Sequence, residues 1–269
     1  MPWRRRLIGF GDPVVDAPGV LPDDERWSRL PDSAGELRAI SHALPGVAEI
    51  HAGEDDRKRY LFNSGAAGVP LLHFSTHAAI DLTDPNRSRI LFTPESGQRG
   101  SEYLFRSEVQ ALPLGGVDLV TLSACDTERG KLAPGEGIQS FSRAFLAAGA
   151  RSTVTTLWRV ADRPAADLMR LFYEHLGRGE TKAESLRAAK LTFLRSRTQL
   201  SLPKYWAAFV LTGDGQAPIR PLLSWSWFIG PAIAAALVTF LLYRCCFHRN
   251  RRRFRRTATV GAAAPRPDC

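Results

Sequence analysis

Two largely apolar runs in the middle of the chain constrain its fold most strongly. One extends from Val69 to His77 and the other from Val117 to Cys125. Each is rich in Val and Leu and is bounded by Gly or polar residues, which is typical of a strand buried on both faces of a parallel sheet. One run ends in an imidazole and the other in a thiol. Because ligands of open α/β sheets bind at the carboxyl ends of the strands, we expect His77 and Cys125 to meet at that edge.

Segments with helical periodicity separate these and other apolar runs. Further strands are predicted at residues 7–11, 151–158 and 206–212, and helices at residues 32–44, 55–62, 135–149, 164–176 and 182–195. The helices are expected to begin at polar caps: Asp32-Ser33, Asp162, and the capping box of Thr181 and Glu184. The polar stretch 81–100, broken by Ile90-Leu-Phe, is a candidate substrate loop. Strands that alternate with helices predict an α/β fold with a mostly parallel sheet covered on both faces.

Length and charge limit the classes of function. A chain of 269 residues can hold one α/β domain and an appendage. Eight Arg and one Asp in residues 244–269 supply +7 of the net charge of +9, so the folded part is nearly neutral. We therefore expect no specific binding of nucleic acid. The four Cys have no zinc spacing, and Gly135-Glu-Gly137 does not complete a phosphate-binding loop, so neither metal nor cofactor is predicted.

A membrane helix is predicted after the folded domain. The 23 residues between Arg220 and Arg244 carry no charge, which is enough to span a bilayer as a helix. Trp225, Trp227 and Tyr243 would lie at the two interfaces. The expected organisation is a folded domain at 1–215, a linker at 216–221, a transmembrane helix at 222–243 and a disordered Arg-rich tail at 244–269.

Two features of the sequence favour opposite orientations of this helix. Arginines such as Arg244 and Arg249 favour a cytoplasmic tail by the positive-inside rule. The N-terminus shows no signal peptide, and an unpaired reactive thiol fits a reducing compartment. We expect a single-pass, tail-anchored or re-entrant protein with its catalytic domain in the cytoplasm, whose arginines also contact anionic lipid headgroups.

Cys125 and His77 are the candidate chemical groups. A thiol at the end of a buried strand is often only a small packed side chain. The polar residues after Cys125 place it at an accessible loop, where a neighbouring imidazolium can lower the pKa of the thiol. His73 is the competing base, but it lies within its strand and is interpreted as structural.

These residues belong to a set of ordered motifs that resembles the CHAT domain, a caspase-like cysteine peptidase family related to separases. The motifs are His73-Phe-Ser-Thr-His77, Leu122-Ser-Ala-Cys125-Asp-Thr, Gly135-Glu-Gly137, Arg143-Ala-Phe-Leu-Ala-Ala-Gly149, Leu157-Trp158, Asp162, Leu168-Met169, Phe172-Tyr173 and Tyr205-Trp-Ala-Ala-Phe-Val210. The resemblance implies a caspase-like three-layer α/β/α sandwich over about residues 5 to 215.

The resemblance also implies residue roles. Cys125 would attack a peptide carbonyl and His77 would handle the proton, while the backbone N–H groups of Ala78 and Cys125 would hold the oxyanion. Ser123 and Asp126 are possible pocket residues. Ser123 stands two residues before the nucleophile, where basic-specific relatives such as metacaspases carry an acid.

The sequence thus predicts a membrane-anchored cysteine endopeptidase that cleaves a protein substrate. It contains no sensor repeats, so we expect an activating sensor protein in trans. The alternative is a catalytically weak or inactive CHAT-type interaction module at the membrane. Its sequence support is Ala78, where the family usually has Gly.

Overall fold

A six-stranded mixed sheet forms the centre of the first compact unit, residues 1–220. The structure is a computed structural model. It describes residues 5–15, 27–44, 46–63, 69–81, 83–96, 98, 100–123, 137–158, 160–196, 199–219 and 239–240. The strands are β1 (Arg5–Gly11), β2 (Val47–Ala52), β3 (Leu71–Ser75), β7 (Leu119–Leu122), β8 (Ser152–Thr156) and β9 (Phe209–Gly213).

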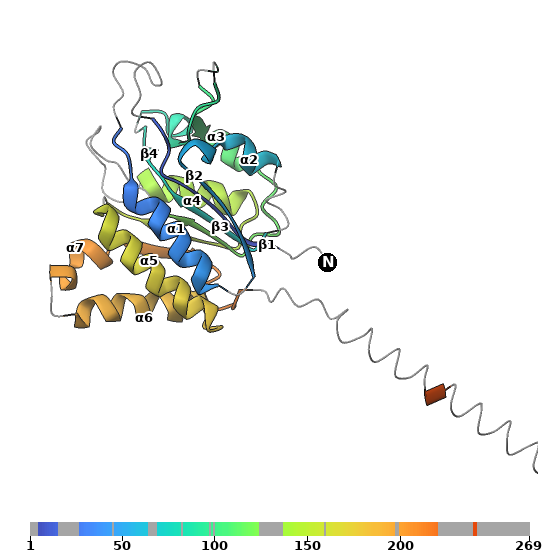
Figure 1. Ribbon diagram of the computed structural model, residues 1–269. Helices are drawn as coiled ribbons and strands as arrows, with labels where there is room; N and C mark the ends of the chain where they lie inside the picture. The colour runs from blue at the N-terminus through green and yellow to red at the C-terminus, as the bar shows by residue number, and fades with distance from the viewer. Residues whose placement is uncertain are drawn as a thin grey trace, which may run out of the picture. The chain divides into compact units, whose positions relative to one another are not determined.

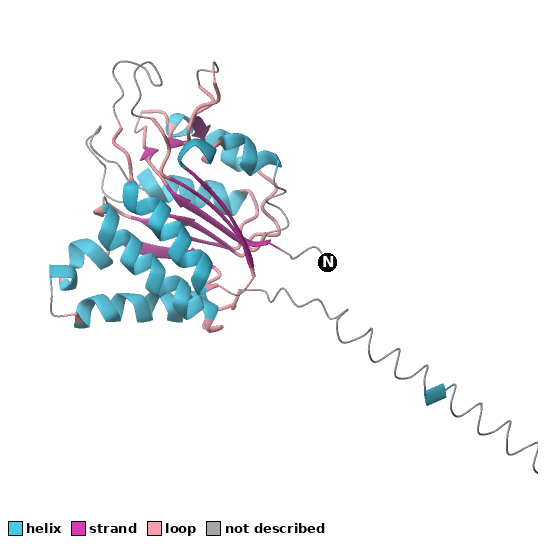
Figure 2. Ribbon diagram, viewed as in Figure 1, coloured by secondary structure: helices cyan, strands magenta, loops and turns pink. Residues whose placement is uncertain are grey.

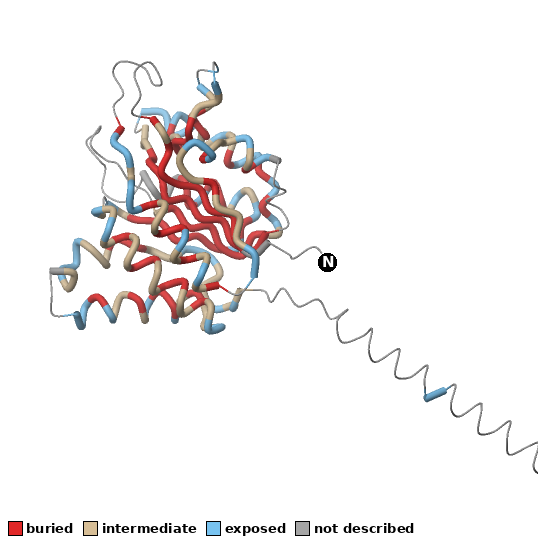
Figure 3. The backbone as a smooth tube through the Cα atoms, viewed as in Figure 1, coloured by how far each residue is buried: buried red, intermediate tan, exposed pale blue. Residues whose placement is uncertain are grey.

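The strand order is β2-β1-β3-β7-β8-β9, and the pairs are parallel except for β8 with β9. The central strands β3, β7 and β8 are buried along their whole length (Figure 3). This is the environment that the two apolar runs predict, because a strand covered on both faces needs apolar residues at successive positions. The predicted strands at 7–11 and 151–158 are confirmed, and β9 begins three residues later than expected.

Helices cover both faces of the sheet, which makes a three-layer α/β/α arrangement (Figures 1 and 2). One face carries α1 (Pro31–Ala43), α5 (Asp162–Gly177), α6 (Lys182–Arg195) and α7 (Pro203–Trp206); the other carries α2 (Lys58–Asn63), α3 (Arg106–Gln110) and α4 (Gly137–Ala147). Short 3₁₀ turns are η1 (Gly53–Asp55), η3 (Pro85–Arg87) and η4 (Gln199–Ser201). Successive strand residues pack into opposite cores: Leu71 belongs to the core under α5, and Leu72 to the core under α4.

A second, three-stranded antiparallel sheet stands at the carboxyl end of β3. It consists of β4 (Ala78–Ala79), β5 (Arg89–Leu91) and β6 (Tyr103–Phe105). The candidate substrate loop at 81–100 thus contains β5 at the apolar break that the sequence shows. Ile90, Leu91 and Phe92 are fully buried, and burial of these three side chains fixes the segment against the domain.

The predicted helix caps had mixed outcomes. Thr181 and Glu184 form the expected capping box at α6, which spans the predicted residues. At α1 the N-cap is Leu30 rather than Asp32-Ser33, because Pro31 starts the helix. At α5 the N-cap is Ala161, and Asp162 is the first helical residue. Both predicted caps instead make tertiary hydrogen bonds, described below.

The second compact unit comprises residues 221–269, of which the structure describes Thr239 and Phe240, both helical. Within the described part of the chain, no helix has the length and apolar character needed to cross a bilayer. The predicted span at 222–243 lies outside the described residues except for these two.

Candidate active site

His77 lies at the carboxyl edge of the main sheet, between the end of β3 and the start of β4. Its side chain is 3% exposed, and its ring centroid is 5.0 Å from that of Trp27. The apolar residues of β3 pack into the core, and the backbone bends at Thr76 just before His77. Thr76 Oγ1 donates to Leu91 O at 2.6 Å. The predicted catalytic base is therefore held at a strand end, with its ring packed against an aromatic neighbour.

The imidazole of His77 contacts a backbone carbonyl. Nε2 lies 2.6 Å from the carbonyl oxygen of Ser28, in the segment before α1. A carbonyl oxygen can only accept a hydrogen bond, so Nε2 carries the hydrogen. In the neutral ring, the lone pair is then on Nδ1, and Nδ1 is the basic nitrogen.

The strand that leads to Cys125 lies directly beside β3. In the parallel register His73 faces Thr121 and Phe74 faces Leu122, and Ser123 N donates to Phe74 O at 2.8 Å. Ser123 follows the end of β7, and its buried Oγ has no hydrogen-bond partner among the described residues. Cys125 and Asp126, the predicted nucleophile and pocket residue, lie outside the described residues.

Ala78, the predicted oxyanion residue, pairs with Ile90 across β4 and β5. Because Leu91 N donates to His77 O at 2.9 Å, ladder alternation makes Ala78 and Ile90 a non-hydrogen-bonded pair. The pairing of β4 with β5 therefore does not use the Ala78 N–H. Ala78 does not have a positive φ, so this position does not require glycine.

His73, on the same strand, has a structural environment. It is fully buried, with Nε2 2.7 Å from Glu36 Oε1 and Nδ1 3.1 Å from the hydroxyl of Tyr173. Ser75 donates to the other oxygen of Glu36 at 3.0 Å, and Thr121 lies 2.9 Å from the Tyr173 hydroxyl. This network joins β3 to α1 and α5, which confirms the structural interpretation of His73.

The segment Trp27–Ser33 crosses the carboxyl ends of β1 and β3. Asp12, directly after β1, accepts from Arg29 Nε at 2.9 Å and Arg29 Nη2 at 2.6 Å. Ser33 Oγ accepts from Asp12 N at 3.1 Å and donates to the Ser75 carbonyl. Asp32 N donates to Asp162 Oδ2 at 3.1 Å. One short segment thus connects His77 with Asp12 and Asp162.

Two carboxyl groups near this edge have raised pKa values. Burial raises the pKa of Asp56 well above its usual value, and the charge of Asp12 adds to the effect. Burial also raises the pKa of Asp162 to about 6, an effect that the Asp32 N–H opposes and the charges of Glu36, Asp32 and Asp12 reinforce. In both groups, loss of solvent and neighbouring negative charge disfavour ionisation and so raise the pKa.

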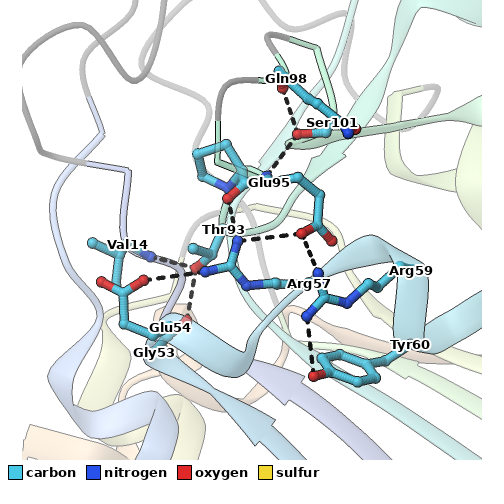
Figure 4. Close-up of polar contacts among 11 residues, drawn as sticks. Val14, Gly53, Glu54, Arg57, Arg59, Tyr60, Thr93, Glu95, Gln98 and Ser101 are labelled. Carbon is cyan, nitrogen blue, oxygen red and sulfur yellow. Dashed lines mark hydrogen bonds and ion pairs between the residues drawn. The ribbon is translucent and has the colours of Figure 1, made fainter.

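Thr93 joins three segments at the β1–β2 side of this edge (Figure 4). Its Oγ1 accepts from Val14 N at 2.8 Å and donates to Gly53 O at 2.7 Å. Next to Thr93, the carbonyl oxygen of Pro94 accepts a hydrogen bond from the Arg57 guanidinium at 2.5 Å. These bonds fix the chain that follows β1, and with it the backbone next to Asp12.

Sequence reasoning missed Ser28, Asp12 and Arg29. The contribution of Ser28 is a backbone carbonyl, which no side-chain pattern encodes, and Asp12 and Arg29 lie between the predicted strand at 7–11 and the predicted helix at 32–44. Within the described residues, no group of three or more His, Cys, Asp or Glu side chains is arranged to hold a metal ion.

Comparisons with known proteins agree with this architecture. The chain is 26% identical over 240 residues to tetratricopeptide repeat protein 28 of Mus musculus and 26% identical over 235 residues to its Homo sapiens counterpart, in each case over 76% of this chain and 9% of the relative. The chain thus spans about a tenth of the length of these curated relatives.

Solved structures share the fold. The Arg-specific cysteine proteinase gingipain R matches 81% of this chain and 48% of its own, with a TM-score of 0.51 and 11% identity. The complex of the Porphyromonas gingivalis RgpB pro- and mature domains matches 81% of this chain and 49% of its own, with a TM-score of 0.50 and 10% identity. The fold is therefore caspase-like. Residues 4–214 match the CHAT domain, and the chain belongs to the CHAT domain family.

Proposed function

We propose that this chain is a caspase-like cysteine endopeptidase with a dyad of His77 and Cys125. The observation that carries the proposal is the contact of His77 Nε2 with the Ser28 carbonyl, which leaves Nδ1 as the basic nitrogen. The adjacent parallel strand β7 ends three residues before Cys125. A held imidazole at this edge is the partner that a cysteine nucleophile needs.

The proposed reaction follows from these groups. His77 Nδ1 accepts the proton of the Cys125 thiol, and the thiolate attacks the carbonyl carbon of a peptide bond. The N–H groups of Ala78 and Cys125 stabilise the oxyanion of the tetrahedral intermediate. His77 then gives its proton to the departing amine, which leaves an acyl-enzyme. Water, deprotonated by His77, hydrolyses the thioester and restores the thiol. Ser123 and Asp126 are proposed to border the substrate pocket.

Profiling of new protein N-termini tests this activity. Cells that express the full chain are compared with cells that express Cys125→Ala or His77→Ala. New termini that depend on both residues are expected. Identical protein N-termini in all three strains, under conditions that activate the chain, would favour the alternative of a non-catalytic interaction module.

We also propose that residues 222–243 anchor the chain in a membrane with the catalytic unit in the cytoplasm. The support is the uncharged stretch between Arg220 and Arg244, flanked by an Arg-rich tail suited to anionic lipid headgroups. The anchor would raise the concentration of enzyme near a membrane-bound protein substrate. An activating sensor protein in trans belongs to the same proposal.

Fractionation tests the anchor. The full chain should stay in the membrane pellet after alkaline carbonate extraction, and a chain that ends at residue 219 should move to the supernatant. Protease added to intact cells should leave the catalytic unit uncut. A full chain found in the supernatant would contradict the anchor.

A further inference from the structure

We propose that Asp12 is a positioning residue for His77 and acts through Arg29 and the backbone of Ser28. The inference rests on the proposed function, because the position of His77 matters for catalysis if His77 is the base.

The backbone of Asp12 has an uncommon conformation. With a φ of 52°, it is the one non-glycine residue with positive φ in the described part of the chain. This conformation is unfavourable for L-residues with a side chain, and Gly adopts it without that cost. Asp tolerates it better than most residues because its short side chain bonds locally. The Asp12 side chain is 12% exposed, and the contacts that it makes explain why a non-glycine residue stands at this position.

Those contacts go to the two residues that follow Ser28. Arg29 donates to both carboxylate oxygens of Asp12, from Nε at 2.9 Å and from Nη2 at 2.6 Å. Leu30 N donates to Oδ1 at 3.3 Å. A two-pronged guanidinium–carboxylate pair fixes direction as well as distance. Asp12 therefore anchors the backbone immediately after Ser28.

The residue before Ser28 is anchored by packing. Trp27 is 7% exposed and lies in a small core with Val15, Leu91 and Tyr103. Ser28 itself is exposed, so its own side chain does not fix the segment. The direction of the Ser28 carbonyl is thus set by Trp27 on one side and by the Asp12–Arg29 pair on the other.

Loss of the ion pair removes one of these two anchors. The Ser28 carbonyl can then leave its position 2.6 Å from His77 Nε2. Hydrogen bonds weaken steeply with misalignment, so the imidazole would no longer be held in one orientation. When a general base is displaced by about 1 Å, the rate of the catalysed reaction can fall by as much as 100-fold.

Four substitutions separate this role from a general effect on folding. Asp12→Gly removes the carboxylate without backbone strain, because Gly adopts positive φ readily. Arg29→Ala removes the other partner of the ion pair, and because Arg29 is exposed, this substitution leaves the buried core unchanged. Arg29→Lys keeps the charge but not the fork, so its effect should be intermediate. Arg151→Ala is the matched control, because it breaks an Arg–Asp contact of 2.8 Å with Asp214, in the turn after β9.

The readout is the imidazole N–H signal of His77 in nitrogen-15 histidine spectra of the full chain, assigned by its absence in His77→Gln. A sharp, slowly exchanging Nε2–H signal is expected in the wild type and in Arg151→Ala. It should broaden or disappear in Asp12→Gly and Arg29→Ala, and the double variant should be no worse than either single variant. Persistence of the sharp signal in folded Asp12→Gly or in Arg29→Ala would overturn the inference.

A kinetic measurement distinguishes this inference from the proposed function. The rate of Cys125 alkylation by iodoacetamide should fall about 10- to 100-fold in Asp12→Gly and Arg29→Ala. If Cys125 of the wild type reacts no faster than Cys269, the proposed function fails, while the spectra still decide the role of Asp12. If the wild type is reactive and both variants retain signal and rate, only the positioning role fails.

Discussion

Ser28 and His77 lie 49 residues apart in the sequence, and the carbonyl oxygen of Ser28 accepts a hydrogen bond from His77 Nε2 at 2.6 Å. The contact involves the backbone of one residue and the side chain of the other. It defines which imidazole nitrogen carries the hydrogen and which is basic. The assignment of His77 Nδ1 as the catalytic base depends on this one contact.

Substitution of Ser28 should therefore have little effect. In Ser28→Ala the carbonyl remains in place, so the rate of Cys125 alkylation should stay within about twofold of the wild type. His77→Gln removes the basic nitrogen and should lower that rate about 100-fold or more. Peptide-resolved mass spectrometry after timed alkylation measures both. An equal loss in Ser28→Ala would mean that the hydroxyl, not the carbonyl, is the functional group.

The Glu36–His73 pair should contribute stability and not chemistry. Glu36→Ala removes the partner of a fully buried imidazole 2.7 Å away, which should lower the free energy of unfolding by about 3 kcal/mol. The control is Glu180→Ala, which breaks a Glu–His contact of the same length with partly exposed side chains. It should cost less than about 1 kcal/mol. Urea unfolding measures both, and equal losses would contradict the role of burial.

Asp162 should make stability depend on pH. Its pKa in the folded protein, about 6, is above the ordinary value of 3.8. The folded state therefore binds more protons than the unfolded state between these values, and the free energy of unfolding falls as pH rises from about 4 to about 6.

Asp162→Asn removes this pH dependence and should be more stable than the wild type above pH 6, with no such advantage below pH 4. For a fully buried carboxyl such a shift would amount to about 3 kcal/mol. Solvent screening at this half-buried site reduces the expected gain to about 1 kcal/mol. Urea unfolding from pH 4 to pH 8 measures it. A difference that does not change with pH would contradict the explanation.

Thr93→Val should loosen the chain next to Asp12. Val keeps the shape of Thr but leaves Val14 N and Gly53 O without their partner, at a cost of about 2 kcal/mol. Thr192→Val is the control, because that exposed hydroxyl donates to Ala188 O within helix α6. It should change the free energy of unfolding by less than about 0.5 kcal/mol. Similar losses for both variants would show that Thr93 does not join the three segments.

The central strands were predictable, but the edge strand β2 and the second sheet were not. β3 and β7 are covered on both faces, so both of their faces carry apolar residues, and these runs mark them directly. β2 is a partly exposed edge strand with the polar residues Glu49 and His51, and the sequence analysis missed it. The three short strands of the second sheet were also missed, because two or three residues are too few to show a period.

The sequence predicted the reactive side chain of the candidate site, His77, but not the groups that hold it in place. His77 was identifiable because a reactive residue follows an apolar run. The Ser28 carbonyl has no side-chain signature, and the Asp12–Arg29 pair joins residues of a segment that has no helical or strand period. Asp32 and Asp162 were both interpreted as local helix caps, but they bond to each other across 130 residues of sequence. Tertiary contacts of this kind take polar groups away from their local roles.

Alkylation of Cys125 as a function of pH tests the central claim, activation of its thiol by His77, most directly. The full chain and His77→Gln are treated with iodoacetamide from pH 5 to pH 9, and each cysteine is followed by mass spectrometry with Cys269 as the internal reference. We predict that Cys125 reacts faster than Cys269 at pH 6 and that His77→Gln abolishes the difference. A wild-type Cys125 that reacts no faster than Cys269, or one whose rate is unchanged in His77→Gln, would contradict the account.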